Sequence, residues 1–356
     1  MTRVLVAEDS VTVRKRLCEV LAGDPAIEVV GEAANGKEAV ALCQALRPDV
    51  MTMDMMMPLM SGLSATEYIM AHCPTPILIV SLSLNRGELF KTYDALAAGA
   101  VDVLDKPGGD EPEGDWEHRF LSAVKLVSRI RVITHLRARR GPPAPPPPVR
   151  TTFGPTAPGG LSPDATRVIA IGASTGGPGA LCTVLSRLSP QVKVPVLLVL
   201  HINEPFGTAF ADWLDAQVPR PVAYAQDGDA LSAWAGRIAV APPGRHLTVK
   251  HGRLRLTQDA ERHSCRPSVD VLFDSVASDI GAPALGCLLT GMGRDGAAGL
   301  LAMRRAGAVT IAQDEATSVI YGMPREAALL GAASHVLPLP EIGSTLSALA
   351  VRESNP

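Results

Sequence analysis

Three side chains that could carry out nucleophilic catalysis together each follow an apolar segment of the sequence. Ser174 lies in a G-x-S-x-G pattern, whose small residues allow a tight turn between a strand and a helix. His201 directly follows the apolar run 194–200, and Asp295 lies in the loop after 284–290. A serine, an imidazole that takes its proton and a carboxylate that orients the imidazole can attack a carbonyl carbon. The three residues therefore predict a hydrolase with a serine nucleophile.

Each of these residues also has a simpler interpretation. A turn rich in Gly and Ser before a helix often binds phosphate or caps the helix, and most histidines are structural. In addition, Gly291-Met292-Gly293-Arg294-Asp295-Gly296 matches the dinucleotide-binding pattern G-x-G-x-x-G, with Asp314 about where a ribose-binding acid would lie. That pattern comes late in the chain and would leave Ser174 and His201 without a role. Three candidate groups at three strand ends favour the hydrolase.

A second set of reactive side chains lies in the first third of the chain. Glu8 and Asp9 follow the first apolar run, and Asp54 follows the third. Ser81 ends the fourth run, and Lys106 comes after the fifth. If the runs are parallel strands, their ends bring these residues together at one edge of a sheet. Neighbouring carboxylates repel one another and need a cation, and their hard oxygen ligands suit Mg²⁺. A carboxylate beside that ion and a lysine can accept a phosphoryl group, with the serine hydroxyl donating to one of its oxygens.

The elements that position this acidic set alternate between short apolar strands and helical patterns, which predicts a parallel, doubly wound α/β sheet. Parallel strands place their carboxyl ends along one edge, where such folds bind ligands. The expected strands are Val4–Ala7, Ile27–Ala33, Val50–Met53, Ile77–Ser81 and Val101–Leu104, and the expected helices are Val13–Leu21, Lys37–Leu46, Ser64–His72 and Leu89–Ala98.

A change of composition divides the chain. A helical pattern over 115–140 is followed by a segment dense in proline and glycine, which is typical of an extended linker. At Arg167 a second βα series begins and predicts another doubly wound, mostly parallel α/β domain. Its expected strands are Val168–Gly172, Val194–His201, Arg237–Ala241, Ala284–Thr290 and Val309–Asp314. We therefore expect one domain over 1–125, a helix end and linker over 126–165, and a second domain over 166–350.

Composition excludes several classes of protein. Hydrophobic residues make up 47% and charged residues 19%, so the chain has enough material for two cores. A formal net charge of −3 argues against a general nucleic-acid or membrane-surface binder. The six cysteines have no metal-ligand spacing. A strand begins within three residues of Met1, and no apolar run reaches membrane-spanning length. We therefore expect a cytoplasmic protein with reduced thiols.

Residues 1–107 resemble the receiver domains of response regulators. The shared features are Glu8-Asp9, Asp54 followed by Met57-Pro58 and Gly62, Ala98-Gly99-Ala100, and Lys106-Pro107. The resemblance implies a flavodoxin-like (βα)5 fold, with Asp54 as phosphoryl acceptor. It also implies Glu8, Asp9 and Asp54 as Mg²⁺ ligands, and Ser81 and Lys106 as phosphate contacts. Val103 stands where these domains commonly have an aromatic residue, so any conformational relay must use other residues.

Residues 167–345 resemble the catalytic domain of the CheB family, the chemotaxis receptor methylesterases. The matching segments are IGASTGG (171–177), DGD (227–229), IAVAPPGRH (238–246), RPSVDVLF (266–273), LTGMGRDG (289–296), QDEAT (313–317) and YGMP (321–324). The resemblance implies Ser174 as nucleophile, His201 as general base and acid, and Asp295 as the orienting carboxylate. Backbone N–H groups near Thr175 and Met292 are the implied oxyanion donors, and no cofactor is implied here.

Two departures from the family pattern lie close to the predicted site. The family commonly continues His-Met-Pro, whereas this chain has His201-Ile202-Asn203, so the rim of the site is expected to differ. Cys265 stands where a histidine or tyrosine is often found. We interpret Cys265 as a change in packing and not in catalysis.

The two resemblances together imply an enzyme of chemosensory adaptation. It would hydrolyse glutamate methyl esters on methyl-accepting chemoreceptors, deamidate receptor glutamines more slowly, and receive phosphoryl groups from a chemotaxis histidine kinase. We expect the unphosphorylated receiver domain to cover the Ser174 site. The alternative is a second domain that binds a receptor without catalysis, and an intact Ser174–His201–Asp295 set argues against it. No helix-turn-helix with a basic recognition helix follows the linker, so DNA binding is not expected.

Overall fold

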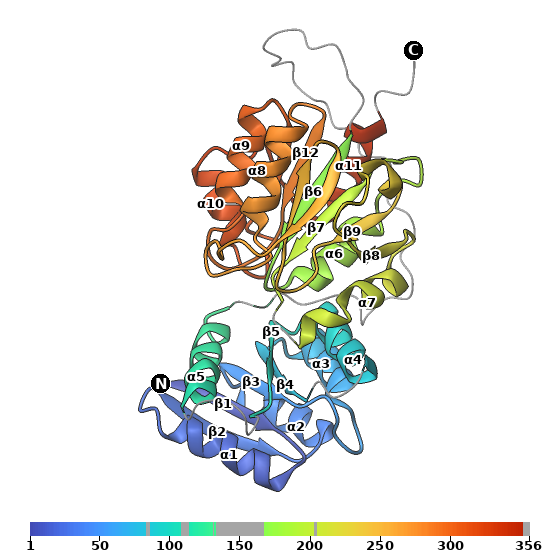
Figure 1. The fold of residues 1–356 in the computed structure, drawn as a ribbon. Helices are drawn as coiled ribbons and strands as arrows, with labels where there is room; N and C mark the ends of the chain where they lie inside the picture. Colours follow the sequence, from blue (N-terminus) through green and yellow to red (C-terminus); the bar gives the residue numbers. More distant parts are fainter. Residues whose placement is uncertain (83–85, 108–113, 131, 133–166, 203–204, 352–356) are drawn as a thin grey trace.

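The structure, a computed structural model, describes two α/β lobes that lie one above the other in Figure 1. The described residues are 1–82, 86–107, 114–130, 132, 167–202 and 205–351. Most of the predicted linker, from 133 to 165, lies outside these ranges, as do Asn203 and the end of the helical pattern predicted for 115–140. Among the described residues, no helix is both long and apolar enough to cross a membrane.

The first lobe is a parallel sheet with helices on both faces, as predicted. Its strands are β1 (Thr2–Ala7), β2 (Ile27–Ala33), β3 (Val50–Met53), β4 (Ile77–Ser81) and β5 (Asp102–Asp105), in the order β2-β1-β3-β4-β5. Its helices are α1 (Val11–Ala22), α2 (Gly36–Leu46), α3 (Gly62–His72), α4 (Arg86–Ala97) and α5 (Asp115–Val127). The strand order reverses between β1 and β3. Glu8 and Asp54 therefore emerge at a topological switch point, where such sheets bind ligands.

Helix α5 is shorter than the sequence pattern predicted. Its apolar face buries Trp116, Phe120, Val124 and Val127 against the sheet, and that face ends with the last of these residues. Ser128 then caps the helix, because its N–H donates to the carbonyl of Val124 at 3.0 Å and its hydroxyl donates to the carbonyl of Lys125 at 2.9 Å. The prediction of one helix continuing through residues 128–130 was therefore wrong, because the burial that stabilises a helix stops at Val127.

The second lobe is built on a sheet whose strands all run parallel. Over 167–351 the strands are β6 (Val168–Ala173), β7 (Val196–Leu200), β8 (Val222–Tyr224), β9 (Ile238–Val240), β12 (Ala284–Leu288), β13 (Val309–Gln313) and β14 (His335–Leu337), in the order β14-β13-β12-β6-β7-β9-β8. β6 is entirely buried. The helices are α6 (Gly177–Leu185), α7 (Phe210–Gln217), α8 (Val269–Asp279), α9 (Ala297–Arg305), α10 (Met323–Leu329) and α11 (Leu339–Val351).

Some elements of this lobe were not predicted. β8 and β14 are the edge strands of the sheet and are only three residues long, so neither forms a distinct apolar run. β10 (His246–Lys250) and β11 (Arg253–Thr257) form a separate antiparallel hairpin. Their alternating pattern was not recognised because charged residues face solvent on one side of the hairpin.

Helix α4 connects the two lobes through an aromatic cluster. Tyr93 of α4 is fully buried, and its ring centre lies 5.3 Å from that of Trp213 and 5.6 Å from that of Phe210, both on α7. The Tyr93 hydroxyl donates to the carbonyl of Phe206, and burial raises the pKa of this hydroxyl, so it stays a neutral donor. Beside it, Trp213 Nε1 donates to Asp94 Oδ1 at 2.8 Å. The lobes are therefore joined by buried, directional contacts.

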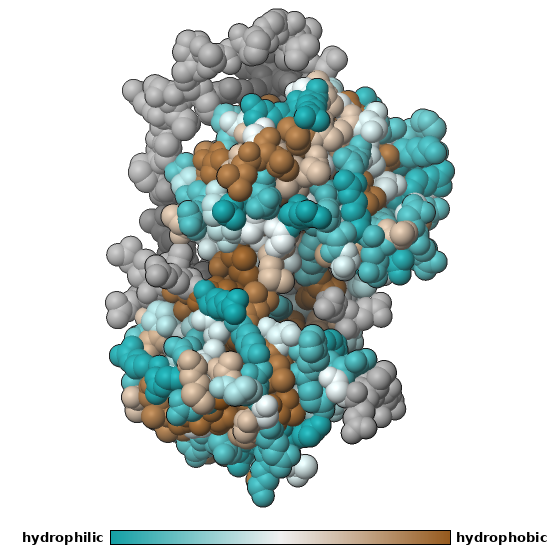
Figure 2. All heavy atoms as spheres, turned by 90° about the vertical axis from the view of Figure 1, so that its left-hand side faces the viewer, coloured by the Kyte–Doolittle hydropathy of each residue, from teal (hydrophilic) through white to brown (hydrophobic). Residues whose placement is uncertain are grey.

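Two smaller contacts bring the first lobe close to the turn that carries Ser174. A Cβ added at Gly179 of α6 would lie 3.4 Å from the carbonyl oxygen of Ala97, at the end of α4. Val319 packs against the core of the first lobe and also against Gly176, where an added Cβ would lie 2.6 Å from Val319 Cβ. Figure 2 shows hydrophobic residues along the waist between the lobes. The first lobe therefore contacts segments close to the predicted nucleophile.

Candidate active site

The three predicted catalytic residues follow three neighbouring strands. β6 lies between β7 and β12 in the sheet. Ser174 follows β6, His201 follows β7, and Asp295 lies in the loop after β12. The His201 N–H donates to the carbonyl of Ala173 at 3.0 Å, and the Ser174 N–H donates to the carbonyl of Thr290 at 3.0 Å. These backbone hydrogen bonds continue the sheet pairing beyond the strand ends. They hold the serine between the two elements that supply the histidine and the aspartate.

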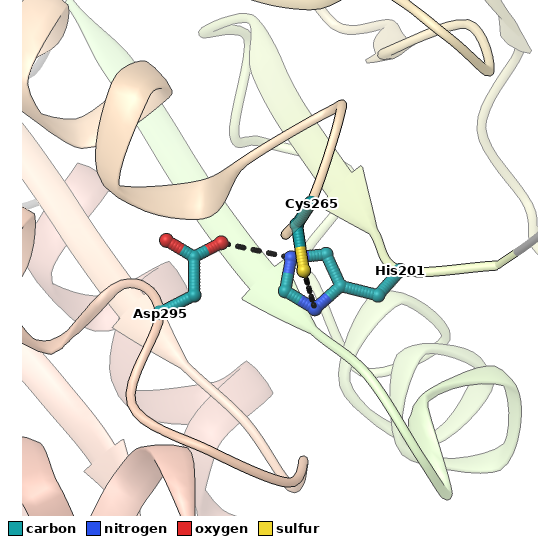
Figure 3. Close-up of side chains that lie close together, drawn as sticks. All are labelled: His201, Cys265 and Asp295. Carbon is teal, nitrogen blue, oxygen red and sulfur yellow. Dashed lines mark hydrogen bonds and ion pairs between the residues drawn. The ribbon is translucent and has the colours of Figure 1, made fainter. Parts of the chain in front are cut away.

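Asp295 binds the imidazole and is itself held by the start of α8. Its Oδ2 lies 2.8 Å from His201 Nε2, as Figure 3 shows. Oδ2 also accepts the N–H of Val269 at 2.7 Å, while Oδ1 accepts the Ser268 hydroxyl at 2.8 Å and the N–H of Asp270 at 3.0 Å. A helix N-terminus stabilises a carboxylate in this way. Ser268, the N-cap residue of α8, was not predicted as part of the site, although Ser is common at this position.

The electrostatics of the pair keep Asp295 ionised and His201 basic. Burial opposes ionisation of Asp295, but the hydrogen bond and charge of His201, with the α8 donors, outweigh it and lower the carboxyl pKa. Burial likewise opposes protonation of His201, but hydrogen bonds to Asp295 and Cys265 outweigh it and raise the imidazole pKa to about 9. With Nε2–H donated to Asp295, Nδ1 is the ring nitrogen left to take a proton from serine.

Cys265 packs against the imidazole of His201. Its Sγ lies 3.8 Å from His201 Nδ1, in front of the face of the ring (Figure 3). Within the described part of the chain, no hydrogen bond joins the Ser174 hydroxyl to His201. This contact joins segments 64 residues apart in sequence, and its partner was therefore not predicted. The thiol therefore lies beside the nitrogen that would take the serine proton.

The predicted oxyanion donors are available for an incoming oxygen. In the part of the chain that the structure describes, neither the Thr175 N–H nor the Met292 N–H donates a hydrogen bond. Gly291 lies directly against the nucleophile, since a Cβ added there would stand 2.7 Å from Ser174 Cβ and 2.4 Å from Met323 Sδ. Any larger residue at 291 would displace the serine. Unpaired amides next to a partly exposed serine suit stabilisation of a tetrahedral oxyanion.

The two acids of the dinucleotide-binding pattern are both used within the domain. Asp295 faces His201, and Asp314 accepts the N–H of Thr317 at 3.0 Å and its hydroxyl at 2.5 Å. Helix α9 begins only at Ala297, after the whole glycine pattern, with Gly296 as its N-cap. The glycines thus shape the loop that presents Asp295, and this arrangement favours the hydrolase interpretation.

The pH dependence of hydrolysis follows from the raised pKa of His201. Only the neutral imidazole can accept the serine proton, so we expect kcat/KM to rise by about tenfold per pH unit and to level off near pH 9. Initial rates of ester hydrolysis at constant ionic strength measure this profile. Cys265→Ser removes one of the groups that favour the imidazolium, so its profile should shift to lower pH. A wild-type plateau reached already near pH 6.5 would contradict the expectation.

A pocket in the first lobe contains the other predicted set. Lys106 Nζ lies 2.8 Å from Glu8 Oε2 and 3.1 Å from Asp54 Oδ1, and Asp54 is 3% exposed. Burial and the Asp54 charge raise the pKa of Glu8 against the opposing effect of Lys106. Burial opposes protonation of Lys106, but Glu8 and Asp54 outweigh it and raise the ammonium pKa. Ser81 is buried at the end of β4 and donates to the carbonyl of Leu82 at 3.3 Å.

This pocket fits a divalent cation with hard oxygen ligands. Carboxylate oxygens of Glu8, Asp9 and Asp54 lie within 4.8 Å of one another. Two of these residues are buried and Asp9 is exposed, so the set opens to solvent on one side. Mg²⁺ prefers a few carboxylates together with water or phosphate oxygens. The residues present therefore suit Mg²⁺ beside a phosphorylated Asp54.

Comparison with known proteins finds a family for each lobe. A family model described as CheB methylesterase matches residues 169–346, and one described as response regulator receiver domain matches residues 4–112. The protein-glutamate methylesterase/protein-glutamine glutaminase 4 of Geobacter metallireducens is 43% identical over 99% of this chain and 100% of its own length. The protein of the same name from Myxococcus xanthus is 43% identical over 97% of this chain and 96% of its own.

A solved structure is also similar to the second lobe. The catalytic domain of the Thermotoga maritima CheB methylesterase is 30% identical, with 52% of this chain and 100% of that chain covered and a TM-score of 0.49. The two matching domains and the full-length relatives define a response regulator with an enzymatic output domain. The chain belongs to the CheB methylesterase family, with a receiver domain at its N-terminus.

Proposed function

We propose that this chain is a receiver-controlled serine hydrolase that removes methyl groups from glutamate γ-methyl esters on chemoreceptors and deamidates receptor glutamines. The observation that carries the proposal is the 2.8 Å contact between His201 Nε2 and Asp295, at strand ends adjacent to Ser174. Phosphorylation is assigned to 1–125 and catalysis to 166–350, with 126–165 between them. The proposed partners are methyl-accepting chemoreceptors and a histidine kinase, and the proposed location is the cytoplasm.

The reaction proceeds in two halves at Ser174. The serine hydroxyl attacks the ester carbonyl while Nδ1 of His201 takes its proton, and Asp295 holds the resulting imidazolium. The Thr175 and Met292 N–H groups receive the oxyanion. His201 then protonates the leaving methoxide, which departs as methanol. Water enters, loses a proton to His201 and cleaves the acyl-enzyme to glutamate. A glutamine follows the same path with ammonia as a poorer leaving group.

Control arises from the contact between the lobes. The α4 contacts reach α7 and α6, which follow His201 and Ser174 in the chain. Mg²⁺ held by Glu8, Asp9 and Asp54 would neutralise charge on a phosphoryl group, and Lys106 would move from Asp54 toward that group. The movement of Lys106, which follows β5, would shift the neighbouring helix α4. The packing of α4 against Trp213 would then weaken, and the Ser174 site would open. Interfaces of this kind need only a few kcal/mol of differential interaction, roughly 1–3, to shift between states.

The function is tested on the substrate itself. Membranes that contain methylated chemoreceptors are incubated with the full chain, and receptor peptides are then analysed by mass spectrometry. We expect methylated glutamates to lose one methylene mass and glutamines to become glutamates more slowly. Receptors that lose neither modification, in a preparation where a known methylesterase removes both, would contradict the proposal.

Phosphoryl control predicts a specific loss in an Asp54→Asn variant. A small-molecule phosphodonor with Mg²⁺ should accelerate methanol release by the wild-type chain, whereas the variant should keep its basal rate and show no acceleration. The amide cannot accept a phosphoryl group in the form of an acyl phosphate. Asp49→Asn is the matched control, because the Asp49 carboxylate lies outside the pocket and accepts the Arg3 N–H. The phosphodonor should still accelerate methanol release by this variant. Equal acceleration of Asp54→Asn would show that the phosphoryl acceptor is another residue.

The α4 contact predicts a gain of basal activity in Asp94→Ala. This change removes the acceptor for Trp213 Nε1, a hydrogen bond worth about 0.5–1.5 kcal/mol. Without phosphodonor, the closed arrangement should therefore weaken and basal methanol release should rise by roughly twofold to tenfold. Glu88→Ala, on the same helix, gives a baseline for changes to α4. Unchanged basal rates in Asp94→Ala would mean that this contact does not restrain the enzyme.

A further inference from the structure

Arg294 lies at the rim of the candidate active site and has no role in the hydrolytic mechanism. It stands on the loop after β12, two residues after Met292, whose N–H is a proposed oxyanion donor, and directly before Asp295. Consecutive Cα atoms are about 3.8 Å apart, so the Cα of Arg294 lies within about 8 Å of the Cα atoms of both residues. Arg294 is exposed, whereas Asp295 is buried. A positive charge therefore stands close to the place where the ester must bind.

A chain of hydrogen bonds holds the Arg294 side chain in place. Its Nε donates to His263 Nδ1 at 3.4 Å, and this direction is fixed because a guanidinium can only donate. The other ring nitrogen of His263, Nε2, then carries the proton and donates to Asp270 Oδ2 at 3.0 Å. Asp270 is fully buried, and its Oδ1 accepts the N–H of Gly299 in α9 at 2.6 Å. The arginine is thus connected to the backbone of a helix through two ordered side chains.

A strained turn brings His263 to this position. Arg262 and Cys265 exchange two backbone hydrogen bonds of 3.2 and 3.0 Å, and His263 and Ser264 between them have positive φ values of 54° and 58°. Non-glycine residues adopt this conformation only where the surrounding structure imposes it. The turn therefore presents the histidine to Arg294 before any ligand arrives. An arginine that is ordered in advance loses less side-chain entropy when it binds a ligand.

Arg294 differs from the other arginine of this cluster because its charge is not neutralised. The Arg262 guanidinium is paired with Asp274 at 2.5 Å and with Asp270 at 3.6 Å. Among the residues that the structure describes, no carboxylate forms an ion pair with Arg294, and its two terminal nitrogens make no hydrogen bond. These nitrogens are therefore available to an acidic group that enters the site from solvent.

We propose that Arg294 is a specificity-determining residue that binds a carboxylate of the substrate segment close to the esterified glutamate. This specificity rests on the proposed function. The planar guanidinium matches a carboxylate and can bind it through two parallel N–H···O hydrogen bonds. The ester itself is uncharged, so the carboxylate belongs to another side chain of the same segment. Hydrolysis supplies such side chains, because each methyl group that is removed leaves a glutamate. An ester with acidic neighbours is therefore preferred to the same ester among neutral neighbours.

Initial rates of methanol release measure this preference with two receptor peptides. One peptide carries a glutamate methyl ester with glutamates within four residues on either side, and the other has glutamine at these flanking positions. For the full-length wild type, we expect KM to be about three- to tenfold lower for the acidic peptide, with kcat values within about twofold of each other. Arg294→Ala should give equal KM values, and Arg294→Lys should keep part of the difference. Equal KM values for the wild type would overturn the proposal.

Two further variants separate a site at Arg294 from a general effect of charge. Arg305→Ala is the matched control, because Arg305 is exposed in the last turn of α9, at the end of that helix away from the Asp295 loop. This variant should keep the wild-type preference for the acidic peptide, and Arg294→Glu should reverse it. If Arg305→Ala and Arg294→Ala lose the preference equally, the carboxylate does not bind at Arg294.

Peptide binding tests the same residue without any enzymatic readout. The full-length Ser174→Ala variant is titrated into each peptide, labelled with a fluorophore, and the anisotropy gives Kd. The acidic peptide should bind about three- to tenfold more tightly, and adding Arg294→Ala should remove the difference. If binding shows this difference but no preparation releases methanol, the Arg294 site stands and the proposed hydrolase function fails. If the two peptides bind equally or not at all, the Arg294 site fails even where methanol release from receptor membranes requires Ser174.

Discussion

Ser174→Ala is expected to lower the rate of methanol release by at least about 10⁴-fold while leaving the fold intact. The alanine keeps the backbone hydrogen bond to Thr290 and the small volume that Gly291 demands, so only the attacking oxygen is lost. The measurement is the initial rate of methanol release from methylated receptor membranes at saturating substrate. Thermal unfolding of the same variant shows whether the fold is preserved, and we expect a Tm close to that of the wild type.

A serine-to-alanine control in the same lobe separates the nucleophile from general effects. Ser344 is exposed on α11 and its hydroxyl donates only to the carbonyl of Glu341 at 2.9 Å. Ser344→Ala should therefore hydrolyse the ester at the wild-type rate. A Ser174→Ala variant that retains more than about a tenth of the wild-type rate would exclude Ser174 as the nucleophile, because a residual rate of that size needs an intact nucleophile and base.

Asp295→Asn is expected to lower kcat by about 10³–10⁴-fold through the tautomer of His201. The carboxylate accepts the Nε2–H, which leaves Nδ1 free to take the serine proton. An amide nitrogen turned toward the ring would donate to Nε2 and place the proton on Nδ1, where it blocks the base. The asparagine also loses the charge that stabilises the imidazolium. We therefore expect kcat to fall much more than KM rises.

The same variant should also be less stable than the wild type. Asp295 accepts the Ser268 hydroxyl and the N–H groups of Val269 and Asp270 at the start of α8, and an amide oxygen can satisfy only part of this set. We expect a loss of about 1–3 kcal/mol in the free energy of unfolding. Asp259→Asn, on an exposed loop, is the matched control and should change neither value. A normal kcat in Asp295→Asn would mean that another group orients His201.

The strand ends that carry the chemistry were predictable from sequence because parallel strands buried on both faces form unbroken apolar runs. β2, β3 and β4 have the predicted bounds, whereas the neighbouring order of β7, β6 and β12 was not predicted. The resemblance to receiver domains singled out Asp54 as the phosphoryl acceptor, whereas the G-x-S-x-G pattern already indicated Ser174 as a nucleophile. The alternation of strands and helices alone supplied only their common edge.

Features that depend on distant contacts were not predictable. The short edge strand β14 is stabilised by pairing with β13 and has no pattern of its own. The carboxylate of Asp295 depends on the start of α8, and neither Ser268 nor the backbone of Val269 indicates this partner in the sequence. Cys265 reaches His201 only because the turn after Arg262 folds back over the end of β7. In each case the missing information is a tertiary contact.

We propose that one chain joins a phosphate-accepting switch to a Ser174-dependent esterase, and a single assay measures both parts. Methanol release from methylated receptor membranes is followed for the wild-type chain, first with Mg²⁺ alone and then after a small-molecule phosphodonor is added. We expect a slow release that accelerates when the phosphodonor is added and that Ser174→Ala abolishes in both phases. No methanol in either phase, or a release that continues in Ser174→Ala, would contradict it.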